Sequence, residues 1–300
     1  LDREVDDRGD DVEGKSVLRR APLQPGPDEL LSLRHPTNVL LPLFGWMLAL
    51  PISALATVGR MEKLVFLVCP RSGKAAADLA RPLLGDVVDA LVASGARGLQ
   101  VNVDDAEVAG AAVRFTHLPA AVGAVVSVWV DAAEVSAPAL ATALADPDVV
   151  DSVAGYLVTE SVPLADGRPV SAGERTPGFA NIALLRRPAE LSPATWRERW
   201  QGDHTRVAID TQSTFGYTQN LVVRAVTPDA PAIDAIVEEL FPIEALADFH
   251  AFFDTGGDDE ELGRRLTAMT TSTAAFGADR ELDVIPTSRY LLSSPFPPAR

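Results

Sequence analysis

Three residues that could build a site recur at intervals of four in the segment 192–208: Trp196, Trp200 and His204. At roughly 100° of rotation per residue, each step of four drifts by only about 40°, so a helix places all three side chains on one stripe. That stripe combines an imidazole, which titrates near neutral pH, with two large apolar rings. The spacing therefore predicts a helix that carries a histidine on its buried face.

His204 has two interpretations at this point. A buried imidazole must find a hydrogen-bond partner or give up its charge, so His204 can be a packed residue with a partner on a facing strand. Alternatively, it is a general base that removes a proton from a bound molecule. The helix itself has clear start signals, because Ser192 is a suitable N-cap and Pro193 a suitable first helical residue.

Hydrophobic periodicity predicts the elements that position this helix, beginning in the first half of the chain. Pro82 and Gly85 are expected to break or kink the first helix of that half. The predicted order is strand, helix, strand, strand, helix, strand, over residues 62–68, 74–94, 97–103, 122–130, 137–145 and 153–162. A stretch rich in Gly, Pro and charge, residues 164–177, is expected to be a linker.

The second half repeats this order in part. The predicted elements are strands over 178–186, 214–226 and 284–292 and helices over 193–209 and 231–240, with a turn or bulge at Gly216 and an insertion over 244–278. Each half fits a split βαβ unit, whose sheet exposes one face unless another sheet covers it. We therefore expect an α+β fold of two ferredoxin-like βαββαβ units packed sheet to sheet, the first over 61–163 and the second over 178–300.

Composition limits the classes of partner. The chain has 300 residues, 47% of them hydrophobic, and a net charge of −16, which disfavours nucleic acids and anionic membrane surfaces as partners. A single cysteine, Cys69, excludes an internal disulfide and fits a reducing, cytoplasmic compartment. Four widely spread histidines argue against a structural zinc site.

Residues 1–60 differ from the rest of the chain. Residues 1–34 are polar and charged, whereas 37–59 carry no charge and are nearly long enough to span a bilayer. We expect this segment to be extraneous to the folded protein, because the sequence after Met61 reads as the first strand of a domain. A secretory signal or membrane anchor and a genuine extension are the alternatives. The P-loop pattern at 9–16 is rejected because no hydrophobic strand precedes it.

The second half resembles the EthD family, which belongs to the dimeric α+β barrel superfamily. The similarity lies in the helix that starts at Ser192 and carries Trp196, Trp200 and His204, and in the Gly-Tyr-Thr-Gln-Asn run 216–220; the Arg289-Tyr290 pair is consistent. The resemblance implies an open cavity between helices and sheet. The superfamily includes cofactor-independent monooxygenases, polyketide cyclases, haem-degrading enzymes and muconolactone isomerases. The first half matches only in element order, so we expect one site per chain, with the first half acting as a built-in dimer partner.

The function expected on this basis is that of a small-molecule enzyme without bound metal or cofactor, monooxygenase-like or cyclase- or dehydratase-like, acting on an aromatic or polyketide-like substrate. His204 is the expected general base, Trp196 and Trp200 the expected apolar wall, and Tyr217 and Asn220 the expected donors to a developing oxyanion. A non-catalytic binding or accessory protein is the alternative, and haem bound through His204 is a third. Both a monomer with an internal pseudo-dimer and a homodimer remain open.

Overall fold

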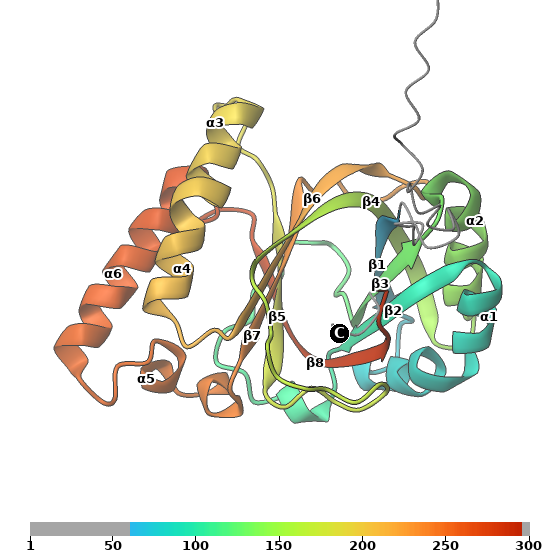
Figure 1. Ribbon diagram of the computed structural model, residues 1–300, viewed down its shortest axis with the longest axis horizontal. Helices are drawn as coiled ribbons and strands as arrows, with labels where there is room; N and C mark the ends of the chain where they lie inside the picture. The colour runs from blue at the N-terminus through green and yellow to red at the C-terminus, as the bar shows by residue number, and fades with distance from the viewer. Residues whose placement is uncertain (1–60, 296–300) are drawn as a thin grey trace, which may run out of the picture. The chain divides into compact units, whose positions relative to one another are not determined.

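The computed structural model describes residues 61–295 (Figure 1). The expectations for residues 1–60, including the pattern at 9–16 and the uncharged segment at 37–59, lie outside the described residues. Within residues 61–295, no helix is long and apolar enough to cross a membrane.

The centre of the fold is a closed barrel in which every strand pairs antiparallel with both neighbours. The order around the barrel is β1-β3-β2-β8-β5-β7-β6-β4. The strands are β1 (Glu62–Pro70), β2 (Ala96–Val103), β3 (Ala124–Val130), β4 (Val150–Leu164), β5 (Phe179–Leu185), β6 (Gly216–Ala225), β7 (Ala235–Phe241) and β8 (Asp283–Ser293). The first four strands run β4-β1-β3-β2 and the last four β8-β5-β7-β6, so both halves have the same internal order.

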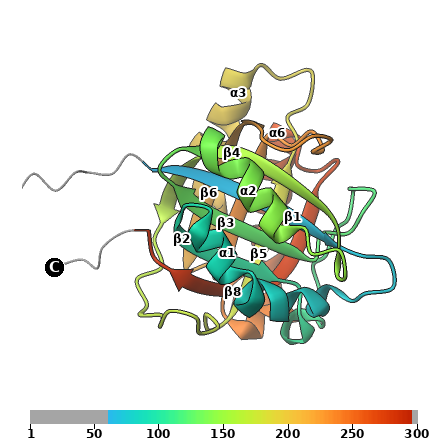
Figure 2. The same cartoon turned by 90° about the vertical axis from the view of Figure 1, so that its right-hand side faces the viewer.

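Helices cover the outer faces of both halves (Figures 1 and 2). Over the first half lie α1 (Val88–Ala93), α2 (Ala133–Leu144) and the short turns Ala76–Leu79 and Pro82–Asp86. Over the second half lie α3 (Pro193–Arg197), a π-helical segment (Glu198–His204), α4 (Thr205–Thr211), α5 (Phe249–Phe252) and α6 (Asp259–Phe276). Short 3-10 turns at Ala106–Val108 and Ile243–Leu246 complete the set.

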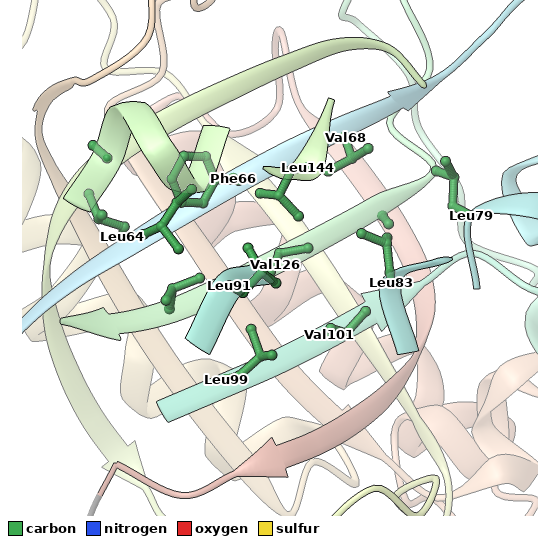
Figure 3. Packing of buried hydrophobic residues seen from close by; sticks show 14 of the residues in the cluster. Leu64, Phe66, Val68, Leu79, Leu83, Leu91, Leu99, Val101, Val126 and Leu144 are labelled. Atoms are coloured by element: carbon green, nitrogen blue, oxygen red, sulfur yellow. The ribbon is translucent and has the colours of Figure 1, made fainter. Parts of the chain in front are cut away.

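Strand β1 explains why the apolar runs of this sequence are continuous. Leu64 and Phe66 point outward into a cluster beneath α1 and α2, whereas Val65 and Leu67 point into the barrel. A strand buried on both faces needs apolar residues at every position rather than at alternate ones. Figure 3 shows the outward cluster, in which leucines from the helices fill the space above the sheet.

The prediction of a helix over 231–240 is wrong, because these residues contain the buried strand β7. The run Ala-Ile-Val-Glu-Glu-Leu-Phe holds good helix formers, and burial on both faces of the barrel removed the alternation that marks a strand. The helix predicted over 74–94 is present as the pieces Ala76–Leu79, Pro82–Asp86 and Val88–Ala93. Its helical type changes at Pro82 and it is interrupted at Val87, close to the predicted break near Pro82 and Gly85. Gly216 begins β6 and pairs with Leu240, so the predicted turn or bulge there is absent.

The inner faces of the two halves pack together inside the barrel, where Val65 and Leu67 share one cluster with Ile182 and Ile236, as the expected sheet-to-sheet packing requires. The two sheets are joined at their edges as well. They are hydrogen-bonded along both edges, through β2 with β8 and through β4 with β6, and this closes one barrel. The insertion predicted over 244–278 contains α6, which packs beside the π-helical segment and α4 on the outer face of the second half. This helix ends at Gly277 in a left-handed conformation (φ 86°), and a Cβ atom there would lie 2.1 Å from Cγ of Pro188.

Candidate functional site

A cavity of about 240 Å³ lies on the outer face of the second half, between the sheet and the helices that cover it. Its wall is largely apolar, with a few polar groups from both sides, which is the usual composition of a small-molecule site. The lining includes Asn181, Ala183 and Leu185 from β5, Tyr217 from β6, Val237 and Glu239 from β7, Trp200, His204 and Gln212 from the segment 193–212, and Met269, Thr273 and Phe276 from α6.

The helical wall begins where the sequence predicted it. The Ser192 hydroxyl accepts a hydrogen bond from the Thr195 amide at 3.1 Å, and Pro193 is the first helical residue. The rings of Trp196 and Trp200 are both buried, with centroids 4.9 Å apart. Trp200 lines the cavity and Trp196 packs against it, so the cavity wall is held by a second aromatic ring.

His204 lies at the end of the π-helical segment Glu198–His204 and is 7% exposed. Its Nδ1 lies 3.0 Å from the hydroxyl of Ser272, and its ring centroid lies 4.7 Å from that of Phe276, both on α6. Burial lowers the pKa of His204 to about 4, because the apolar surroundings disfavour the imidazolium. The ring is therefore neutral at neutral pH, and Nε2 has no hydrogen-bond partner within residues 61–295.

The sheet wall carries a polar row that sequence reasoning missed. Glu239 on β7 is paired with Asn181 on β5 and with Tyr217 on β6, so three polar side chains lie side by side beneath the cavity. Burial raises the pKa of the Glu239 carboxyl to about 7. Burial, and next the nearby Glu239, also raises the pKa of Tyr217, which keeps its hydroxyl protonated.

The missed signal was the Glu-Glu pair at 238 and 239. In the predicted helix both carboxylates would be solvated, whereas in a strand two successive residues face opposite sides. Glu238 points into the barrel, where it accepts hydrogen bonds from Gln100 at 3.0 Å and Asn102 at 2.8 Å. Glu239 points out to the cavity, so one strand supplies two buried carboxyl groups in separate environments.

A comparison with known protein families finds a match to the part of the chain that contains the helical wall of the cavity. Residues 188–261 match the EthD domain. The match contains the helical wall with Trp196, Trp200 and His204 and the strands with Tyr217 and Glu239, and it confirms the predicted resemblance over these residues. It covers about a quarter of the chain.

Several solved structures align with this chain at low sequence identity. An anthrone oxidase-like protein aligns with 9% identity and a TM-score of 0.42, covering 80% of this chain and 96% of that chain. Two proteins described as "putative monooxygenase" align as well. The one from Fusobacterium nucleatum subsp. nucleatum has 7% identity and a TM-score of 0.39, covering 78% of this chain and 93% of its own. The one from Lactobacillus acidophilus NCFM has 10% identity and a TM-score of 0.37, covering 78% and 96%. No curated protein sequence matches significantly.

Two of the predicted site residues do not line the cavity. Trp196 lies behind Trp200 and contacts its ring, so it supports the wall without forming its surface. Asn220 is on the opposite face of β6 from Tyr217, because residues three apart in a strand face opposite sides. It is paired with Ile236, whose side chain belongs to the cluster inside the barrel, and its Nδ2 donates to the Ile236 carbonyl at 3.0 Å. The expected role of Asn220 as an oxyanion donor beside His204 therefore does not fit this geometry, and Glu239 and Asn181 occupy the sheet side instead.

Proposed function

We propose that this chain is an enzyme that acts on a small aromatic or polyketide-like molecule, with His204 as the general base. The observation that carries the proposal is a neutral, buried imidazole that lines an apolar cavity and whose Nε2 has no hydrogen-bond partner within residues 61–295. A neutral imidazole can accept a proton, and an apolar wall excludes the water that would compete for it. The EthD match over the same residues supports this assignment.

The other residues have roles that follow from their positions. Trp200, supported by Trp196, offers a flat apolar face to an aromatic ring. Tyr217 stays protonated and donates a hydrogen bond to an oxygen on which negative charge develops. Proton removal by His204 then yields an enolate or phenolate. That intermediate either reacts with dioxygen, one oxygen atom entering the product and the other leaving as water, or cyclises or eliminates water.

The test uses the full chain with anthrone as the probe, in air and under argon, with consumption followed by absorbance. We expect His204→Ala to lower turnover at least about 100-fold while circular dichroism shows an intact fold. His250→Ala is the matched control, because His250 is a half-buried histidine of the same half that does not line the cavity. Near-normal turnover in His204→Ala would overturn the role of this residue as the base.

A non-catalytic binding protein is the second candidate, and the largely apolar cavity wall favours it as much as it favours catalysis. The same experiment separates the two. If anthrone binds and quenches tryptophan fluorescence but is never consumed, and His204→Ala changes only its affinity, the chain is a binding or accessory protein.

We further infer that the barrel is a tandem pair of ferredoxin-like repeats, the first acting as a built-in partner for the second. The identical internal strand order of the two halves supports this. Such a pair could act as a monomer, and a homodimer remains compatible. We also propose that proton transfer in this site uses no resident metal or cofactor and that the protein works in the cytoplasm.

A further inference from the structure

We propose that Glu239 is a second catalytic residue, which donates a proton to the carbonyl oxygen of an aryl ketone substrate while His204 removes a proton from the adjacent carbon. This inference rests on the proposed function, because it needs His204 as the base. It also names the substrate class of the site: a planar, uncharged ketone with an acidic C–H bond next to the carbonyl group.

The geometry places the two proton-transfer groups on opposite walls of one cavity. His204 comes from the helical wall and Glu239 from the sheet wall, and both line the same space. The only other titratable side chain among the cavity-lining residues described is Tyr217, beside Glu239 on β6. No lysine, arginine or aspartate lines the cavity in the described part of the chain, so a substrate carboxylate would find no counter-ion there.

The neighbours of Glu239 fit an oxygen-bearing ligand. Asn181 is 4% exposed and lines the cavity, yet its Oδ1 has no hydrogen-bond partner within residues 61–295. The Gln212 amide satisfies its hydrogen bonds when its nitrogen faces the Ala208 carbonyl. In that orientation the same nitrogen donates to Oε1 of Glu239 at 3.2 Å. A buried acceptor without a partner is costly, and a hydroxyl group on a bound molecule, such as that of the enol form of a ketone, would donate the missing hydrogen bond.

Protonation states at neutral pH suit this pairing. Burial holds the pKa of His204 near 4, so the imidazole is unprotonated at neutral pH and keeps a free nitrogen lone pair. Burial raises the pKa of Glu239 to about 7, so a large fraction of its carboxyl groups still carry a proton to donate. At neutral pH the cavity therefore holds an unprotonated imidazole on one wall and a partly protonated carboxyl group on the other, which are the states from which this proton transfer starts.

The step balances without a co-reactant. Nε2 of His204 takes the proton of the C–H bond, and that electron pair becomes the carbon–carbon double bond of the enol. The carbonyl π pair takes the proton of Glu239. The enol is left with an imidazolium and a carboxylate, and return of both protons restores the ketone and the resting enzyme.

The test is deuterium exchange into 1-tetralone, an aryl ketone with enolisable hydrogens, catalysed by the full chain in D₂O and followed by NMR. We expect the wild type to exchange the hydrogens next to the carbonyl above the buffer rate, and His204→Ala and Glu239→Gln each to lower exchange at least about 100-fold. Glu238→Gln is the matched control. It makes the same substitution at the next residue of β7, but that side chain faces the barrel interior, so exchange should persist.

Outcomes separate the two claims. Exchange that is lost in His204→Ala but kept in Glu239→Gln would overturn the role of Glu239 and leave His204 as the base. Exchange absent from the wild type, or unchanged in His204→Ala, would overturn both. Infrared spectra test the protonated state of Glu239 without turnover. At pH 6, the band of a protonated carboxylic acid should disappear in Glu239→Gln and persist in Glu238→Gln. Persistence of this band in Glu239→Gln would count against the proposal. If Glu239→Gln fails to fold, Glu239→Asp, which keeps an acid but shortens its reach, should still reduce exchange.

Discussion

The opposite pKa shifts of Glu239 and His204 predict how Glu239→Gln changes the pH dependence of stability. The Glu239 carboxyl has an ordinary pKa of 4.5 and a folded value of about 7, so the folded state binds more protons than the unfolded state between these values. Stability therefore falls as pH rises through this window. A shift of this size corresponds to about 3 kcal/mol, fully expressed above pH 7. Glutamine does not titrate, so Glu239→Gln should remove this loss.

His204 acts in the other direction. Its pKa falls from 6.5 to about 4, so the unfolded state binds more protons in that window and stability rises with pH, again by about 3 kcal/mol in all. In the wild type the two slopes oppose each other between about pH 4.5 and 6.5 and largely cancel. In Glu239→Gln only the contribution of His204 to the pH dependence of stability remains. The free energy of unfolding of the variant should therefore fall steeply on acidification from pH 6.5, whereas that of the wild type should not.

Urea unfolding at pH 5, 6, 7 and 8 measures this directly as a free energy of unfolding. The difference between Glu239→Gln and the wild type should move in favour of the variant by about 2 to 3 kcal/mol from pH 5 to pH 8. Glu238→Gln, on the opposite face of β7, should show no such trend. A difference for Glu239→Gln that stays constant across this range would refute a raised pKa at Glu239 and the cavity argument that depends on it.

Three other substitutions test the packing around the site. Trp200→Ala removes a fully buried ring from the cavity wall and should cost about 3 to 5 kcal/mol in urea unfolding, whereas Trp200→Phe should cost less. Gly277→Ala places a Cβ against Pro188 at a positive φ and should lower the melting temperature, while Gly263→Ala, in the open middle of α6, should not. Ser272→Ala removes the hydroxyl beside Nδ1 of His204 and should lower turnover with little loss of stability, as enzyme assays and unfolding curves together would show.

Sequence patterns predicted the helix of the site well, because its signals are local. The four-residue spacing of Trp196, Trp200 and His204 and the cap at Ser192 depend only on the chain between them. Local sequence signals do not predict the sheet wall of the cavity. Strand β7 (Ala235–Phe241) is buried on both faces by partners more than ten residues away in the sequence. The alternation typical of a surface strand is therefore missing, and good helix formers favour the wrong element. A helix over these residues gives no reason to expect Glu239 in a buried wall, so this residue is missing from the predicted site.

The two halves of the barrel suggest why the polar row exists. In the first half, an outward pair between the first and third strands is Phe66 with Val126, and aliphatic side chains from the helices close over it (Figure 3). In the second half, an outward pair between the corresponding strands is Asn181 with Glu239, beneath a cavity. In the first half, an apolar pair at this place stabilises the fold. In the second half, the buried carboxyl group at this place lowers the free energy of unfolding by about 3 kcal/mol at neutral to alkaline pH. Stability alone favours the apolar solution, so chemistry on a bound molecule is the better account of Glu239.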